Sequence, residues 1–150
     1  MNVGRGAVRV GSHAVVEHTA DVGLRAVADD PAGLLAEASA ALAEIAATVA
    51  GSPATVAVAV EARGTDPAAL VFDWLNALIG VADERGDALV GADVDAAGLV
   101  DEWWIARGRA RLAPYGRSVL PRLHVKAATF HDLRVGKEGR RWRLQAYLDV

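Results

Sequence analysis

The chain has 150 residues, which suits a single domain, and 53% of them are apolar, enough to form a sizeable core. It contains no cysteine, which excludes disulfides, thiolate metal sites and cysteine nucleophiles and agrees with a cytoplasmic location. No apolar run approaches the roughly 20 residues of a membrane span, so we expect a protein that does not enter a membrane. Residues 1–12 lack the hydrophobic run of a secretory signal. We therefore expect a flexible leader over 1–12 and one domain over 13–150.

The net charge of −3 is unevenly divided along the chain. Residues 1–100 hold 5 arginines against 14 carboxylates, a balance of −9, whereas residues 101–150 hold 11 Lys or Arg against 5 carboxylates, a balance of +6. Such asymmetry is typical either of an anionic partner that meets one surface or of two halves of a domain that neutralise each other across an interface.

The first elements in chain order are short apolar runs at 14–17 and 24–28, which predict strands on either side of the polar segment His18-Thr-Ala-Asp-Val-Gly23. An aspartate between two strands often caps its own backbone in a turn, and Asp21 fits that role. His18 and Thr19 nevertheless add hydrogen-bonding and ligand groups that a bare turn does not need. The segment is therefore a candidate functional site as well as a candidate turn.

Two helices are predicted by the same start signal, an aspartate N-cap followed by proline at the first helical position, at Asp30-Pro31 and Asp66-Pro67. Apolar residues then recur at helical spacing after each signal. The first helix should end before Gly51, and the second should run to about Arg85 and stop at Gly86. Asn76 lies between apolar pairs of the second helix, and we expect it to face outward.

The remaining segments alternate apolar and polar residues, or are short apolar runs, and predict strands bounded by turn residues. A turn is expected at 95–98 and a hairpin turn at Gly136-Lys-Glu-Gly139. Consecutive strands joined by short turns pair antiparallel. The sequence therefore predicts an α+β fold, a two-layer sandwich of two helices packed on a mainly antiparallel sheet, with strands at 56–61, 88–94, 104–112, 123–135 and 141–149.

The familiar enzyme signatures are absent, including a phosphate-binding glycine loop, a G-x-S-x-G elbow and an H-E-x-x-H helix. The isolated carboxylates Asp21 and Asp149 remain, with the α-carboxylate of Val150 one residue further on. If these groups converge, their mutual repulsion favours a hard, oxygen-preferring cation such as Ca²⁺ or Mg²⁺, or a lysine such as Lys126. Sequence spacing alone does not decide whether Asp21 and Asp149 converge or are two separate solvated side chains.

Three further features each have an ordinary structural explanation beside a functional one. Lys126 fits an outward-facing strand lysine, and His131 fits a hydrogen-bonded surface imidazole. The alternating Arg107, Arg109 and Arg111 could contact phosphates, or they could be the solvated face of an edge strand that resists aggregation. No aromatic residues interleave with these arginines, which argues against base stacking there.

Several motifs spread over nearly the whole chain from about residue 13 resemble archease, a small protein partner of the RtcB-type RNA-splicing ligase. They are His18-Thr-Ala-Asp-Val-Gly23, Asp30-Pro31, Val60-Glu-Ala62, the helical segment 70–79, Val125-Lys-Ala-Ala-Thr-Phe-His131 and the terminal Leu148-Asp-Val150. The first motif and the last two, in this order and with an aspartate next to the last residue, form the specific part of the resemblance. Phe130 departs from the tyrosine that is common at its position.

The resemblance implies an α+β fold and a divalent-cation site, Ca²⁺ or Mg²⁺, with Asp21 and Asp149 as ligands and Val150 as a contributor. It implies that His18, Glu61, Lys126 and His131 belong to the functional surface around that site. The implied role is an activator that promotes guanylylation and multiple turnover of the ligase in tRNA splicing or RNA repair, without being an enzyme itself. RNA would then be met indirectly, through the ligase.

Two alternatives stay open. The chain is a chaperone-like or RNA-binding module if the arginines of 107–111 carry its function. It is a metal-dependent phosphoesterase if the carboxylates bind a catalytic ion, although that chemistry calls for more ligands and a nucleophile that the sequence does not display.

Overall fold

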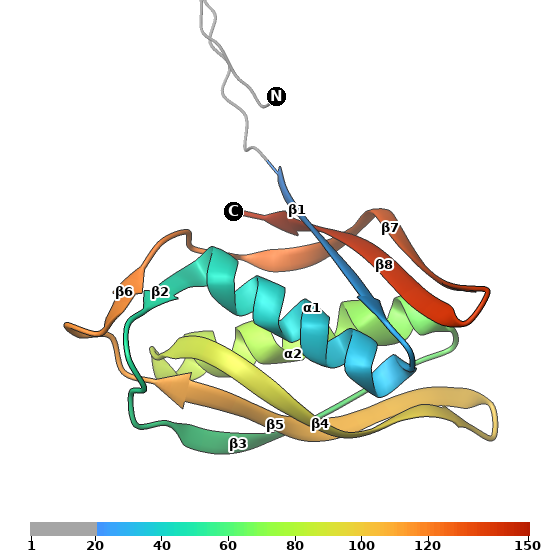
Figure 1. Ribbon diagram of the computed structural model, residues 1–150, viewed down its shortest axis with the longest axis horizontal. Helices are drawn as coiled ribbons and strands as arrows, with labels where there is room; N and C mark the ends of the chain where they lie inside the picture. Colours follow the sequence, from blue (N-terminus) through green and yellow to red (C-terminus); the bar gives the residue numbers. More distant parts are fainter. Residues whose placement is uncertain (1–20) are drawn as a thin grey trace, which may run out of the picture.

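A computed structural model describes residues 21–150 of the chain (Figure 1). The leader expected over 1–12, the strand expected at 14–17 and His18 lie outside the described residues, so these expectations stay predictions. In chain order the elements are β1 (Asp21–Ala28), α1 (Pro31–Ala46), β2 (Ala47–Val49), β3 (Val56–Gly64), α2 (Pro67–Arg85), β4 (Ala88–Val100), β5 (Trp103–Ala113), β6 (Val119–Pro121), β7 (Ala127–Glu138) and β8 (Arg141–Asp149).

Both helices begin where their start signals predict. The Asp30 carboxylate accepts a hydrogen bond from the Gly33 N–H at 2.7 Å, and the Asp66 carboxylate accepts one from the Ala69 N–H at 2.8 Å. These contacts satisfy amide donors that the first helical turn leaves without partners. The second helix ends at Gly86, whose left-handed φ of 69° suits a residue without a Cβ.

The α+β class, the two helices and the antiparallel pairing are confirmed. The strands do not form one sheet, however, but two three-stranded sheets of order β1-β8-β7 and β3-β5-β4 and a small β2-β6 pair. In Figure 1 the β1-β8-β7 sheet lies above the helices and the β3-β5-β4 sheet below them, and each helix contacts strands of both sheets. Alternation shows which side of a strand is buried, but it does not show which strands pair.

The helices are buried on two sides, and the core is continuous from one sheet to the other. At its centre the fully buried Trp74 of α2 donates its indole N–H to Ser39 Oγ of α1 at 2.9 Å, and that hydroxyl donates to the Leu35 carbonyl at 2.6 Å. At one end Trp104 of β5 meets Trp142 of β8 edge-to-face, with ring centroids 5.8 Å apart. This pair joins the two sheets directly.

Expectations for β4, β5 and β7 were wrong. β7 spans Ala127–Glu138 instead of 123–135, so the hairpin turn expected at Gly136-Lys-Glu-Gly139 lies at 139–140. β4 continues through the turn expected at 95–98 and ends at Val100, because register shifts between Leu89 and Gly91 and between Val94 and Ala96 keep it paired with β5. β5 is the central strand of its sheet and not an edge strand.

Neither helix within residues 21–150 has the length and apolar character to cross a membrane.

Candidate functional site

Asp21 and Asp149 lie directly opposite each other. β1 begins at Asp21 and β8 ends at Asp149, and because the two strands run antiparallel, these residues are register partners. Residues so paired have Cβ atoms about 5 Å apart and project from the same face of the sheet. The neighbouring Leu148 is fully buried, so alternation places Asp149 on the outer face, away from the helices.

The two carboxylates have no cationic partner among residues 21–150, where none of the ion pairs includes Asp21 or Asp149. Like charges placed directly opposite each other on a sheet are destabilising. The donor set is oxygen only, which suits a hard cation. It is nevertheless small, because the described part of the chain contains no group of three or more His, Asp or Glu side chains suited to a metal.

The start of β7 completes this end of the sheet. Ala127 is the register partner of Asp149 on the other side, and the Lys126 backbone N–H donates to the Asp149 carbonyl at 2.8 Å. The Lys126 side chain is exposed and makes no ion pair with either carboxylate within the described chain. Lys126 is therefore adjacent to the pair through its backbone.

Asn76 of α2 fixes the position of this strand, which its sequence context did not reveal. Its Oδ1 accepts from the Ala128 N–H at 2.9 Å, and its Nδ2 donates to the Ala128 carbonyl at 3.3 Å and to the Phe72 carbonyl at 3.1 Å. The expectation that Asn76 faces outward was wrong, because the free edge of β7 lies against α2. A polar residue between apolar pairs of a helix was the only signal that could have indicated this contact.

His131 lies further along β7, where the register shifts between Thr129 and Arg134. Its backbone N–H donates to Thr129 Oγ1 at 3.2 Å, and its ring centroid lies 6.2 Å from that of Tyr147 on β8. The imidazole is 71% exposed. His131 thus belongs to the same sheet as Asp149 but stands apart from the carboxylate pair.

Glu61 does not join this group. Val60 and Ala62 are buried in the core, so Glu61 projects from the outer face of the other sheet, across the helix layer from Asp21. Its carboxylate faces Arg107 Nε at 3.5 Å. The structure therefore brings Asp21, Asp149 and Lys126 together and separates Glu61 from them, while His18 lies outside the described residues.

The arginines of 107–111 are matched by carboxylates on the neighbouring strands. Besides the Arg107–Glu61 contact, Arg109 pairs with Asp95 at 2.7 Å and Arg111 with Asp93 at 3.3 Å. The negative first part of the chain and the positive last part thus neutralise each other on this face, which agrees with the structural explanation of the charge asymmetry. The same pairing lowers the positive charge available to a phosphate at these three residues.

Comparison with known proteins shows which protein family the chain matches. The family model described as the Archease protein family (MTH1598/TM1083) matches residues 13–150. A protein named archease from Methanopyrus kandleri is 34% identical over 137 residues, covering 90% of this chain and 96% of that protein. Another from Pyrococcus furiosus is 30% identical over 142 residues, covering 89% and 95%.

Solved structures show the same fold. The solution structure of Methanobacterium thermoautotrophicum protein 1598 superposes with a TM-score of 0.69 at 24% identity, covering 90% of this chain and 96% of that one. The crystal structure of a Thermotoga maritima protein, described as an archease and possible chaperone, gives a TM-score of 0.59 at 19% identity, covering 93% and 98%. These two likenesses establish the arrangement of helices and strands.

Proposed function

Since the chain belongs to the archease family, we propose that it is a protein activator of an RtcB-type RNA-splicing ligase. In this role it promotes guanylylation and multiple turnover of the ligase in tRNA splicing or RNA repair, in the cytoplasm. It is not itself the ligase. The observation that supports the proposal most is the Asp21–Asp149 register pair at one end of the β1-β8-β7 sheet.

The pair is suited to holding a divalent cation, Ca²⁺ or Mg²⁺. Asp21 and Asp149 are the proposed ligands, with Val150 as a further contributor. Ca²⁺ takes about six to eight oxygen ligands, so water or groups of the ligase complete the set. Bound there, the cation supplies positive charge that can stabilise the phosphoryl oxygens of a nucleotide during guanylyl transfer.

The chain's own residues set the position of these ligands. The β1–β8 register holds Asp21 opposite Asp149, and the Lys126 N–H fixes the Asp149 carbonyl from the other side. The exposed side chains of Lys126 and, further along β7, His131 are proposed to face the ligase or its nucleotide. Glu61, on the opposite face, is not part of this proposal.

A guanylylation assay tests the proposal. Purified protein is mixed with the ligase, labelled GTP and a divalent cation, and the labelled ligase is quantified over time. Wild-type protein should accelerate labelling, whereas Asp21→Asn and Asp149→Asn should abolish the gain. Asp95→Asn is the matched control, because Asp95 is also an exposed strand aspartate but lies on the other sheet and should keep full activity. Full stimulation by Asp21→Asn would contradict the proposal.

Thermal unfolding separates the cation site from the ligase. Neutralising one member of an unpaired carboxylate pair should leave the melting temperature equal or higher, because it removes repulsion. Excess Ca²⁺ or Mg²⁺ should stabilise the wild type by about 2.7 kcal/mol at 100 times its dissociation constant and should leave both variants unchanged. A cation-dependent shift of equal size in Asp149→Asn would refute the assigned ligands. Phosphatase activity of the protein alone would favour the enzyme alternative.

A further inference from the structure

The outer face of the β1-β8-β7 sheet carries a basic groove beyond the carboxylate pair. The groove has a volume of about 570 Å³, and its lining includes three arginines at outward-facing positions and one carboxylate, Glu138. We use "basic groove" for the surface around these arginines, which are Arg25 of β1, Arg134 of β7 and Arg143 of β8. These outward-facing groups therefore have a net charge of +2.

The strand register arranges the arginines in rows. Gln145 of β8 faces Arg25 on one side and Arg134 on the other, and the next outward row is centred on Arg143. Neighbouring strands are about 4.8 Å apart, so Arg25 and Arg134 start about 10 Å from each other across the groove. Rows on one face are about 7 Å apart along the strands. The cations thus form a short two-dimensional array.

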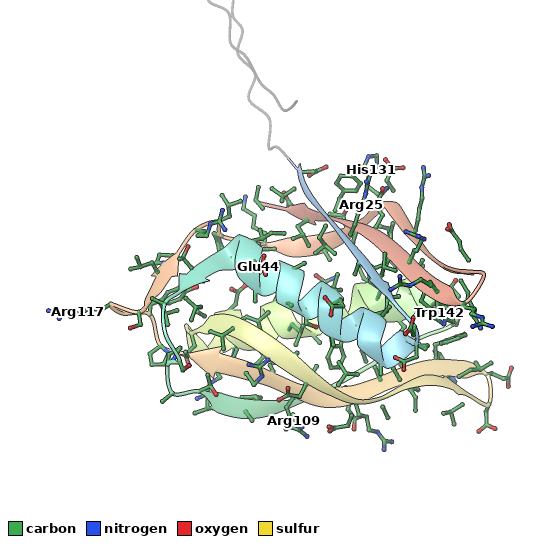
Figure 2. All side chains as sticks on the ribbon, in the orientation of Figure 1. Arg25, Glu44, Arg109, Arg117, His131 and Trp142 are labelled. Carbon is green, nitrogen blue, oxygen red and sulfur yellow. The ribbon has the colours of Figure 1, made fainter. Side chains whose placement is uncertain are left out.

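Part of this charge is not neutralised. Among residues 21–150, Arg25 makes no ion pair, and Arg134 meets only Asp132, at 3.7 Å. Arg143 pairs with Glu138 at 3.0 Å. In the row Arg107, Arg109 and Arg111 of the other sheet, by contrast, all three arginines are paired. Figure 2 places Arg25 on the same side of the molecule as His131 and Arg109 on the opposite side.

Two ring systems lie between the basic groove and the carboxylates. Tyr147 occupies the row between Asp149 and Gln145, and its ring packs so closely over Gly23 that a Cβ there would be 2.9 Å from Cε1. The exposed His131 imidazole stands beside it. The Asp149 row is about 13 Å from the Gln145 row along β8, farther than the screening length of about 8 Å at physiological salt. The carboxylates therefore do not cancel the field of the groove.

We infer that this face binds single-stranded nucleic acid, with Arg25, Arg134 and Arg143 on the phosphate backbone and a base against Tyr147 or His131. Proteins that bind single strands without sequence preference combine a basic groove with aromatic side chains on which bases stack. An acidic protein segment would use the cations but not the rings. The site thus gives the protein a direct nucleic-acid contact, separate from the proposed action on the ligase.

Fluorescence anisotropy with labelled decauridylate and the full chain tests this inference. No ligase is present, and a chelator removes divalent cations, so the result does not depend on the carboxylate site. The triple variant Arg25→Gln, Arg134→Gln, Arg143→Gln should bind at least about tenfold more weakly. The slope of log affinity against log salt should fall by about 2, since each lost single-strand phosphate contact contributes about 0.7.

The other sheet offers a matched control. Arg107→Gln, Arg109→Gln, Arg111→Gln removes the same number of positive charges from the opposite side of the molecule, and should bind like the wild type. Tyr147→Leu should weaken binding about fivefold or more, whereas Tyr147→Phe keeps the stacking surface and should not. Circular dichroism checks that every variant is folded.

Three results would overturn the inference. One is the absence of decauridylate binding to the wild type at about 50 mM salt. The second is equal weakening by the two triple variants, which would indicate a general charge effect. The third is displacement of the oligonucleotide by polyglutamate of equal charge at equal concentration, which would assign the groove to an acidic protein partner. Any of these could occur while ligase activation stands, and ligase activation could fail while binding stands.

Discussion

Replacing Asn76 by leucine should destabilise the protein at the edge of the site. Asn76 forms two hydrogen bonds with the backbone of Ala128, one to its N–H and one to its carbonyl, and these take the place of a neighbouring strand on the free edge of β7. Leucine keeps the volume of asparagine approximately but can neither donate nor accept. Both Ala128 groups would lose their partner in a half-buried environment.

The magnitude follows from those two groups. An unsatisfied buried donor or acceptor costs about 1–3 kcal/mol, and partial burial places each group in the lower half of that range. We expect the free energy of unfolding to fall by about 2–4 kcal/mol. A domain stabilised by about 5–15 kcal/mol remains folded after this loss. With a urea m-value of about 2 kcal/mol/M, the unfolding midpoint should fall by about 1–2 M.

Urea unfolding followed by circular dichroism measures the global effect, and hydrogen exchange of the Ala128 amide measures the local one. Asn76→Asp is a local control, because it keeps the acceptor for the Ala128 N–H but replaces the donor with a carboxylate oxygen that faces the Ala128 and Phe72 carbonyls. It should keep the Ala128 amide protected, whereas Asn76→Leu should expose that amide to exchange. An unchanged midpoint in Asn76→Leu, together with a protected Ala128 amide, would refute the reasoning.

Two further changes test the core and the sheet. Ser39→Ala leaves the fully buried Trp74 indole N–H without its acceptor. The free energy of unfolding, measured in urea, should therefore fall by about 1–3 kcal/mol. Ser39→Thr, which retains a hydroxyl, is the comparison. Gly108→Ala would place a Cβ against the Asp93 carbonyl of β4, so a thermal melt should show a large loss of stability. Gly98→Ala is the control, because a Cβ there meets open space and should leave the melting temperature unchanged. A normal melting temperature for Gly108→Ala would show that β4 can move away from β5.

The helices were predictable from sequence because their determinants are local. The Asp-Pro start signals, the apolar stripe and Gly86 all act within a few residues of the helix ends, and both helices begin where predicted. The alternation of β8 also predicted its buried face, since Leu144, Ala146 and Leu148 are all in the core. Pairing between strands was not predictable, because it depends on contacts between segments that are far apart in the chain.

The candidate site shows the same division between local and distant information. The family resemblance brought Asp21 and Asp149 together, whereas spacing alone could not, and they are register partners in the structure. It also grouped Glu61 with them, which the structure does not support. Asn76 and the basic groove escaped the sequence analysis, because each depends on which strands adjoin β7 and β8. Metal binding by the two aspartates stays a prediction.

The edge-to-face contact of Trp104 with Trp142 gives the fold a built-in optical probe. Two indoles this close couple their electronic transitions, so the pair should contribute an exciton couplet to the ultraviolet circular dichroism spectrum. Because the rings belong to different sheets, the couplet reports how these approach each other and is independent of helix content. Docking of a large partner that separates the two layers at this end would therefore be visible without any added label.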